Sequence, residues 1–503
     1  MALDLNPANG PVPRGRIIAV CALIILLSEI ATFEILMVYP ALPGMAAHFR
    51  TLDVAQAASV VTLAGAVVLP LAGKAADRYG KKRIILVMGG IFLLGSVLCA
   101  TTDVFAVLLI GRLLQGSLVG IVNISYALVR DVVPRSYVPV ALGSVVTGIG
   151  MGAVAGPFLA GTLIDNFGFR SVFWFMVIYV AVLLPLHAWL VPESRVRVKS
   201  SFDILGAILL GASLGVLLVA VGKGGVWGWG STTTIGAFGL GVLLLAAFVL
   251  RELKVAEPLI DLRVLVGRKF LPTVVAVGLV SYMMNAHGIL SPTMFETPHI
   301  PGNTYGVGLS ALQLALWTFP LGIVGMVVGP LGGYLSKRIG ARQVLLASSL
   351  CFLAVMFLGS RMFTVQWQVA ITSFVAGFAV GFLHSSNANL LQDALPERLG
   401  GAGNCIAGVI AMLASSAAVT VTGAIMAEHV RMTLPGSHAV IYGDSAFTQS
   451  YLWAGVVGVF GVAIILLMKH GRKPAQGGLV EENGGLAPVA VGHTASRGSS
   501  GRD

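Results

Sequence analysis

Long apolar stretches separated by short polar segments form the pattern of this chain. Fourteen of these stretches approach the roughly 20 residues that a helix needs to cross a hydrocarbon core. Some contain proline, as at Pro70, Pro320 and Pro330, which membrane helices tolerate because neighbouring groups satisfy the freed backbone atoms. The pattern predicts spanning helices over 17–40, 55–72, 84–101, 105–129, 139–163, 171–191, 204–222, 232–250, 270–294, 309–334, 343–360, 366–390, 402–427 and 450–469.

Composition supports an all-α integral membrane protein. The mean hydropathy is +0.91, and 11% of residues are charged, against roughly 25% in soluble proteins. The net charge of +11 does not indicate nucleic-acid binding, because the basic residues lie in short loops and form no patch. The four cysteines fall within apolar stretches, which favours packing over disulfides. We therefore expect the lipid bilayer to be the main partner.

The loops predict an orientation. If loops alternate between two sides, one side carries 24 Lys and Arg residues and the other carries five. Basic residues stay on the cytoplasmic side of membrane proteins. Both termini are therefore expected in the cytoplasm of a multi-pass cell-membrane protein, in agreement with an even number of spans.

A weak internal repeat divides the chain. GKAADRYGKKR (73–83) and GYLSKRIGAR (333–342) both place glycines and basic residues between two spans. Duplicated halves with a site at their interface are a transporter design. We expect a cytoplasmic N-terminal tail (1–16), a six-helix half (17–191), an inserted two-helix hairpin with its loops (192–269), a second six-helix half (270–469) and a disordered cytoplasmic tail (470–503).

Charged residues lie inside the apolar stretches. Arg112 sits within LLIGRLLQGSLVGIVNISYAL, and Glu29 and Glu34 lie in the first span. A charge at that depth costs about 2.5 kcal/mol or more on insertion scales, so such residues usually have a partner or a function. An intramembrane acid and base in one chain suggest a proton or ion path rather than a passive anchor.

The loop after the second span resembles the G-x-L-a-D-r-x-G-r-k signature of the major facilitator superfamily, with Ala75 in place of the usual Leu. Its glycines allow a tight turn between helices. Asp77 is the lone acid among bases, with Arg130 as a possible partner in a conformational latch. A plain basic loop that sets topology is the alternative. The matching residues are Gly73, Asp77, Arg78, Gly80, Lys81 and Lys82.

The fourth span resembles a second signature of that superfamily, R-x-x-q-G. Arg112, Gln115, Gly116, Gly120 and Asn123 follow a spacing that puts them on one helical face. In the family this Arg is linked to proton coupling, and Gln115 and Asn123 become candidates for the substrate cavity. A structural Arg satisfied by backbone carbonyls is the alternative.

The fifth span carries small residues every four positions. Ser144, Gly148, Gly152 and Gly156 form a stripe that lets another helix approach closely, and Pro157 then loosens the helix. GMGAVAGPFLAG resembles the antiporter signature, which marks exporters in the family. We therefore expect Gly148, Gly152, Gly156 and Pro157 to contribute to conformational gating.

The first span contains FEILMVYPALP, which resembles the L-D-x-T-I-V-N-V-A-L-P pattern of fourteen-span drug:proton antiporters, with Glu34 at the Asp position. Glu34 and Arg112 lie at a similar depth, which permits pairing. Glu29 lies about 140° round the helix from Glu34, so the two acids cannot share a face. For Glu29, proton coupling and a helix–helix hydrogen bond remain open.

The second half offers polar residues within its spans. They could line a cavity, although each alone is more typical of packing or of linking helices. No nucleophile–base set, metal spacing or phosphate loop is evident, so we expect no enzyme activity and no metal or other cofactor. The cavity candidates here are Tyr282, Asn285, His287, Trp317, His384 and Asn387.

The resemblance implies a major facilitator fold that exports a small lipophilic molecule, with cations among the candidates, in exchange for protons. The proton gradient would supply the energy, through Glu34, Arg112 and Glu29. Export of an endogenous lipid, siderophore or metabolite by the same fold is an alternative. An uptake symporter and a non-transporting scaffold or sensor are further alternatives.

Overall fold

The computed structural model describes most of the chain as a bundle of long helices. The described residues are 13–133, 152, 155–194, 203–255, 258–260, 262–300, 303–361, 365–394, 400–433, 440–471, 479–482 and 485–488. Among them, 13 helices are long and apolar enough to cross a membrane. Each corresponds to a predicted span. The remaining predicted span, 139–163, lies largely outside the described residues, and the helical segment 155–167 covers its end.

The first half contains two spans that are interrupted near their middle. The first span is divided into two helices at Glu29, and the fourth is divided at Gly116 and Ser117. Segment 155–167 follows these helices in the chain. The labelled helices of this half are α1 (Arg14–Ser28), α2 (Ile30–Phe49), α3 (Ala55–Tyr79), α4 (Lys81–Thr101), α5 (Phe105–Gln115), α6 (Leu118–Val132) and α8 (Arg170–Leu190).

Two helices follow the first half and pack where the two halves meet. They are α9 (Ile204–Trp227) and α10 (Thr232–Glu252). Helix α9 contacts α3 of the first half and α16 (Gly400–Glu428) of the second, and α10 packs on α9. Only 17% of the most apolar window of α10 is buried, so most of its surface is free to face lipid.

The second half continues with long helices. A short helix, α11 (Leu262–Leu265), precedes it. Helix α12 is largely buried, at 78% of its most apolar window, and forms the centre of this half. The remaining helices are α12 (Phe270–Glu296), α13 (Ala311–Ile339), α14 (Ala341–Gly359), α15 (Gln366–Ala394), α16 and α17 (Asp444–Leu467).

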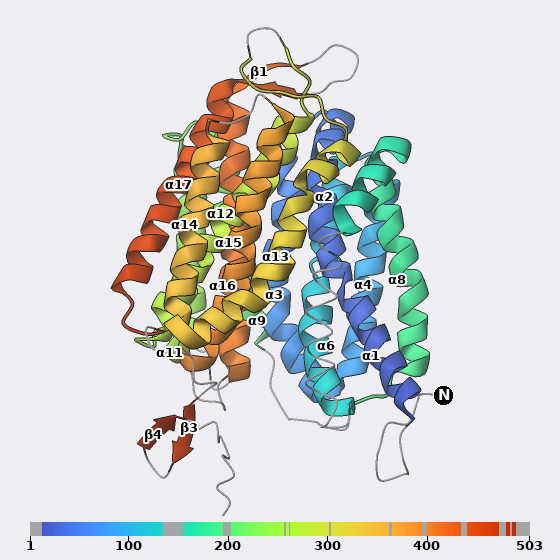
Figure 1. Ribbon diagram of the computed structural model, residues 1–503, viewed down its shortest axis with the longest axis vertical. Coiled ribbons are helices and arrows are strands. Elements are labelled where there is room, and N and C mark those ends of the chain that lie inside the picture. The colour runs from blue at the N-terminus through green and yellow to red at the C-terminus, as the bar shows by residue number, and fades with distance from the viewer. Residues whose placement is uncertain are drawn as a thin grey trace, which may run out of the picture.

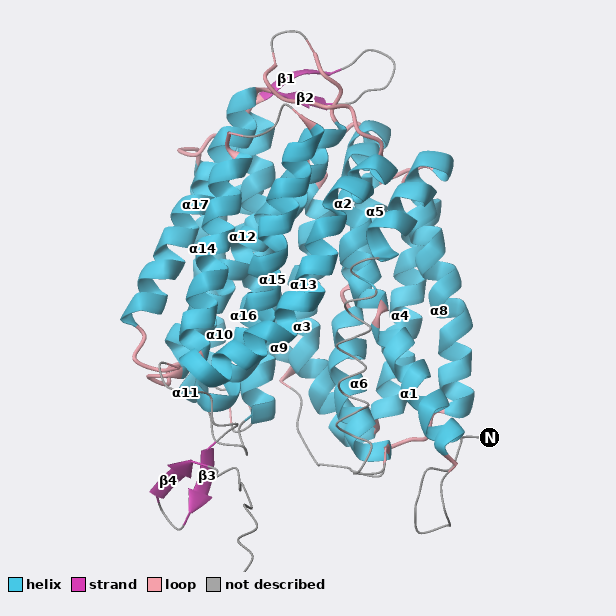
Figure 2. Ribbon diagram, viewed as in Figure 1, coloured by secondary structure: helices cyan, strands magenta, loops and turns pink. Residues whose placement is uncertain are grey.

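The bundle has two ends, which we name after elements that lie there. The α1 face is the end where α1 begins, and the β1 face is the opposite end, which carries β1 (Val430–Thr433) and β2 (Val440–Tyr442) (Figure 1). Figure 2 shows helices filling the space between the two faces. The all-α prediction is confirmed, because 84% of the structure is helical.

The weak sequence repeat corresponds to a repeated backbone geometry. Gly80 ends α3 with φ 117° and ψ 136°, and Gly340 ends α13 with φ 96° and ψ 144°. In both places the next helix begins at the following residue. A side chain strongly disfavours these positive φ values, so glycine permits both turns.

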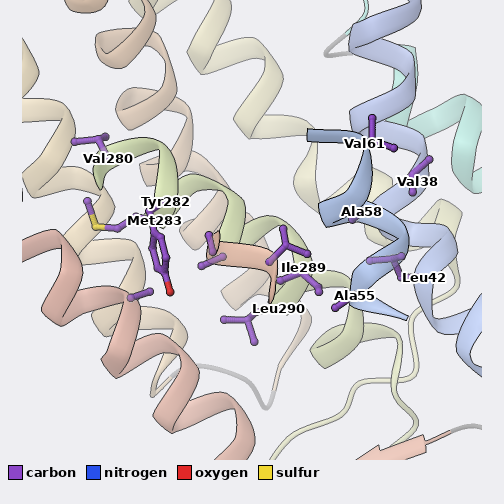
Figure 3. Close-up of a cluster of buried hydrophobic side chains, with 14 of the residues drawn as sticks. Val38, Leu42, Ala55, Ala58, Val61, Val280, Tyr282, Met283, Ile289 and Leu290 are labelled. Atoms are coloured by element: carbon purple, nitrogen blue, oxygen red, sulfur yellow. The ribbon is translucent and has the colours of Figure 1, made fainter. Parts of the chain in front are cut away.

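Buried apolar side chains join the two halves near the β1 face. Val38 and Leu42 of α2 lie beside Ala55, Ala58 and Val61 of α3, and α12 approaches them through Ile289 (Figure 3). A second cluster lies between α1, α3, α4 and α6, nearer the α1 face. The first cluster therefore packs across the halves, whereas the second packs within the first half.

Two short β-hairpins were not predicted. Strands β1 and β2 pair antiparallel between α16 and α17, and β3 (Leu479–Glu482) pairs antiparallel with β4 (Gly485–Pro488). The second hairpin lies within 470–503, the segment expected to be a disordered tail.

Candidate functional site

The central feature of the first half is a buried ion pair. Arg112 of α5 donates from Nη2 to Oε1 of Glu34 on α2. The side chains of Arg112 and Glu34 are only 1% and 4% exposed. The similar depth predicted for these residues therefore does bring them together, and each charge has the opposite charge as its partner.

Arg112 is also held by groups other than Glu34. Its Nε donates to the carbonyl oxygen of Ala57 on α3 at 2.6 Å, and its Nη1 donates to Oε1 of Gln115. The guanidinium carbon lies 5.8 Å from the ring centroid of Phe173 on α8. Arg112 thus connects four helices. The alternative of a backbone-satisfied Arg is partly realised, but alongside a carboxylate partner.

Gln115 belongs to this network. It is fully buried, and its Nε2 donates to Oγ of Ser96 on α4 at 2.8 Å. Its two ends therefore bridge Ser96 and Arg112. In this conformation Gln115 is a network residue, and its role in a substrate cavity stays a prediction. Asn123 is exposed on α6, and its Nδ2 donates to the carbonyl oxygen of Val119 in its own helix.

The fourth span is interrupted one residue beyond Gln115. The Gly116 amide donates to the carbonyl oxygen of Leu113, a tighter bond than the helical pattern. A Cβ at Gly116 would lie 2.5 Å from the Cβ of Ala64 and 3.0 Å from the amide nitrogen of Gly65, both on α3. Glycine therefore allows the close approach of α3 that places the Ala57 carbonyl beside Arg112.

Glu29 occupies a separate place from Glu34. It is 5% exposed, and its Oε2 has no hydrogen-bond partner among the described residues. A Cβ at Gly152 would lie 3.1 Å from this Oε2 and 2.9 Å from Cγ2 of Thr32. Glu29 therefore faces the fifth span. The expectation that the two acids occupy different faces agrees with this placement.

The small residues of the fifth span make two different contacts. Gly152 faces Thr32, and a Cβ at Gly156 would lie 3.3 Å from Cβ of Leu36, so both pack on the first span. Further along, a Cβ at Gly161 would lie 2.6 Å from the amide nitrogen of Leu312 at the start of α13. Gly148 lies outside the described residues. Pro157 is half-buried within segment 155–167.

A polar contact joins the two halves near the ion pair. The Tyr39 hydroxyl of α2 donates to Oδ1 of Asn285 on α12 at 2.9 Å. The Asn285 amide donates in turn to the Ser415 hydroxyl of α16 at 2.9 Å. Gly288 lies against the Tyr39 ring. Asn285 was predicted from the sequence as a cavity candidate, whereas its partner Tyr39 was not among the candidates.

The other second-half candidates are placed separately. Tyr282 accepts from Nε1 of Trp453 at 3.1 Å, and Nδ1 of His287 lies 3.2 Å from the Tyr451 hydroxyl, both linking α12 to α17. Trp317 packs against the main apolar core. His384 is exposed on α15, and Oδ1 of Asn387 is buried without a partner among the described residues. Tyr282 and His287 are therefore helix-linking residues in this conformation.

At the α1 face, the loop signature is tied to the first half. Asp77 lies 3.8 Å from Nζ of Lys81 and is 48% exposed. Lys81, only 7% exposed, forms its closer ion pair with Asp131 at the end of α6. Gly73 lies within α3 and not in the bend at Gly80, so the expectation that it shapes the turn is corrected. The Arg78 guanidinium lies 5.3 Å from the Tyr79 ring. The side chain of Arg130, the predicted partner of Asp77, lies outside the described residues.

Asp131 has a second partner that sequence reasoning missed. The Ser194 hydroxyl donates to its Oδ2, and the neighbouring Glu193 accepts from the backbone amides of Lys82 and Arg83 at 2.9 and 3.1 Å. Glu193 therefore caps the N-terminus of α4, where a carboxylate is favoured. These acids lie at span ends with ordinary loop composition, so no pattern distinguished them.

At the β1 face, Asp103 connects α4, α2 and α8. It accepts from Nη2 of Arg170 and lies 2.9 Å from Nε2 of His48. Hydrogen bonding to Arg170 first, and to His48 second, lowers the pKa of the Asp103 carboxyl below its usual value. Asp103 is highly exposed, so this cluster belongs to the surface of the first half.

The chain belongs to the Major Facilitator Superfamily, whose family model matches residues 22–419. The fold agrees: the structure covers 97% of the xylose transporter XylE from E. coli, at 13% identity over 90% of this chain with a TM-score of 0.59. It also covers 100% of the human organic anion transporter MFSD10, at 18% identity over 91% of this chain with a TM-score of 0.53. The major facilitator fold is therefore shown by sequence and structure together.

The sequence relatives include named exporters. An uncharacterized MFS-type transporter of Mycobacterium tuberculosis is 31% identical over 70% of this chain, and the match spans about 50% of that relative's length. The tetracenomycin C resistance and export protein of Streptomyces glaucescens is 27% identical over 78% of this chain and 72% of its own. The multidrug resistance protein Stp of M. tuberculosis is 28% identical over 74% and 68%. These relatives agree with the family that the model shows for this chain.

Proposed function

We propose that this transporter exports small lipophilic molecules in exchange for protons and is of the fourteen-span drug:proton antiporter type. The buried Glu34–Arg112 ion pair carries the proposal. An intramembrane ion pair is costly to desolvate, and hydrophobic side chains would often serve stability as well. An acid beside a permanent cation can take up and release a proton, which is a function that a purely structural ion pair does not have.

Protonation at Glu34 changes the charge that the first half must carry. With Glu34 ionised, its charge and that of Arg112 compensate one another. When Glu34 takes a proton, the Arg112 cation keeps its bonds to the Ala57 carbonyl and to Gln115. The proton would be taken up from one side and released on the other as the halves rock around the site. Substrate and proton would exclude one another, which makes the exchange an antiport.

Contacts between the halves could transmit the effect of Glu34 protonation to the second half. Tyr39 lies five residues beyond Glu34 on α2 and donates to Asn285 of the second half. A shift of α2 on protonation would therefore alter a contact that joins the two halves. Gly152 and Gly156 allow the fifth span to follow α2 closely, as gating requires.

The charge bias of the loops supports an orientation with the α1 face in the cytoplasm, so both termini would be cytoplasmic in a cell membrane. The names of several relatives support drugs or antibiotics as substrates. An endogenous lipid, siderophore or metabolite is the second candidate. Transport assays with both substrate classes in liposomes distinguish them.

The decisive experiment replaces Glu34 with glutamine. Glu34→Gln keeps size and hydrogen bonding but removes the titratable group, so we expect folded protein without substrate-driven proton movement in proteoliposomes. Glu29→Gln in the same span is measured beside it, and loss of proton movement in that variant would assign Glu29 to the coupling path as well. Substrate-driven proton release by Glu34→Gln at the wild-type rate would disprove coupling through Glu34.

Arg112 tests the other partner. Arg112→Ala leaves Glu34 without its counter-charge and should abolish coupled transport. Arg112→Lys keeps the charge but lacks the planar fork that reaches Glu34, Ala57 and Gln115 together, so at most a fraction of transport should remain. Wild-type transport by Arg112→Ala would assign Arg112 a structural role only.

A further inference from the structure

A partly open cavity lies at the β1 face between the two halves. Its volume is about 370 Å³, within the range of small-molecule sites. The first half contributes Leu42 and Asp165 to its walls, and the second half contributes Ile289, Glu296 and Met426. Tyr442 of β2 also lines it, so the β1–β2 hairpin forms one wall.

Glu296 is the least satisfied polar group in this cavity. Its Oε1 is buried and has no hydrogen-bond partner among the described residues. Glu296 is also the last residue of α12, where the helix dipole disfavours a negative charge. A carboxylate in this position requires a proton or a cation to compensate its charge.

Asp165 adds a second acid that is already bound on one side. Its Oδ1 and Oδ2 accept from the backbone amides of Ala311 and Leu312 at 3.0 and 3.1 Å. Both amides lie at the N-terminus of α13, where the helix dipole favours a carboxylate. The cavity walls contain Asp165 and Glu296 but no Lys, Arg or His among the described residues. The remaining walls are mostly apolar.

We propose that this cavity, which we call the vestibule, binds the ammonium group of a small amphiphilic amine, with Glu296 as its counter-ion. A primary ammonium has three donors, so it can satisfy Oε1 of Glu296 and approach Asp165. The apolar part of the amine lies against Leu42, Ile289 and Met426. The role of the vestibule as an exit station for exported cations rests on the proposed function, whereas the binding itself does not.

The binding test compares a cation with its neutral counterpart. The purified full-length protein in nanodiscs is titrated with n-hexylamine and with n-hexanol at pH 7 by calorimetry. We expect Glu296→Gln to weaken hexylamine binding at least tenfold and to leave hexanol binding unchanged. Glu428→Gln is the matched control, because Glu428 also ends a helix at the β1 face but lies outside the vestibule walls.

Three outcomes overturn the proposal. They are absence of hexylamine binding by the wild type, equal hexylamine affinity in wild type and Glu296→Gln, and hexanol binding as tight as hexylamine in the wild type. The last outcome would mean that Glu296 holds a proton instead of a cation. The assay measures binding and not transport. A negative binding result therefore does not affect the proposal for Glu34, and loss of transport in Glu34→Gln does not affect the proposal for the vestibule.

A second measurement uses the unaltered protein, so it does not depend on the folding of a variant. A hydrophobic carbodiimide modifies carboxyl groups in apolar sites, and peptide mass spectrometry reports the modified fraction of Glu296. We expect hexylamine to slow modification of Glu296 several-fold and hexanol to leave it unchanged, with Glu428 as the internal reference. Equal rates with and without hexylamine would contradict occupation of the vestibule by the amine.

Discussion

The two faces of the bundle are held together differently. At the β1 face, Asp165 of the first half binds the start of α13 in the second half, and Gly161 allows the backbones to meet there. At the α1 face the contacts stay within the first half. Lys81 pairs with Asp131 at the end of α6, and Glu193 accepts from the start of α4. One set of contacts therefore closes the two halves against each other, and the other makes a single half rigid.

The inserted helices α9 and α10 also contribute contacts between the halves at the β1 face. Near the β1 face, Lys223 of α9 pairs with Asp53 of the first half, and Trp229 donates to Glu428 of the second half at 3.0 Å. The inserted pair thus adds bonds to both halves on the closed side. We interpret the structure as a conformation closed at the β1 face, in which alternation requires these cross-half contacts to break.

Gly161→Leu should give the largest effect on this comparison. A side chain at Gly161 would collide with the backbone of Leu312, which cannot rotate away as a side chain can. We expect more than tenfold loss of transport and increased labelling of cysteines placed at the β1 face. Gly90→Leu is the matched control, because no atom lies within 4 Å of a Cβ at Gly90. Normal transport by Gly161→Leu would disprove the cross-half closure.

Asp131→Asn should show that the α1-face network stabilises a single half. Lys81 would keep a buried charge with only its longer contact to Asp77, and breaking a buried pair costs about 3 kcal/mol. We expect a lower melting temperature with unchanged cysteine labelling at the β1 face. Asp77→Asn is the matched comparison, since its exposed contact is worth about 1 kcal/mol at most. Equal destabilisation by both variants would contradict the dominant role of Asp131.

Asp165→Asn should shift the conformational balance modestly. Asparagine keeps one acceptor but loses the charge that favours the N-terminus of α13. A change of about 1 kcal/mol corresponds to about a fivefold shift toward β1-face opening. Distances between spin labels across that face measure it. A fivefold shift in the opposite direction would show that Asp165 does not act as a closing contact.

Asp103→Asn should give the smallest effect, because Asp103 lies at the surface of the first half only. Its pKa is lowered in the folded protein, so its contribution to stability is present above the unfolded pKa of about 3.9 and is lost as pH falls through the folded pKa. The small difference in melting temperature between wild type and variant should therefore shrink below about pH 4. A difference that grows on acidification would contradict this sign.

Much of the fold could be predicted from the sequence because the bilayer imposes length and polarity on each span. The 13 spans of the described residues agree with the predicted ones, and the paired bends at Gly80 and Gly340 repeat in sequence and geometry. The β-hairpins were missed because short strands in loops leave a weaker pattern than spans. The division into domains and the gating roles stay predictions.

The sequence predicted those residues of the candidate site whose charge is energetically costly inside an apolar span. Glu34 and Arg112 could be identified because charges within apolar stretches are rare. Asp131 and Glu193 could not, since acids at span ends are ordinary. Glu296 likewise lies at the end of an apolar span. It becomes a candidate binding residue only because other helices form a cavity around it.

The sequence by itself determined the spans, the side on which basic loops gather and the buried charges, because each follows from the cost of placing a residue at a given depth. Tertiary structure alone decided the partners. Glu34 meets Arg112 across 78 positions, and Asp165 meets Ala311 across 146. The register and rotation of packed helices set such contacts, and these depend on the close fit of the bundle rather than on any one span.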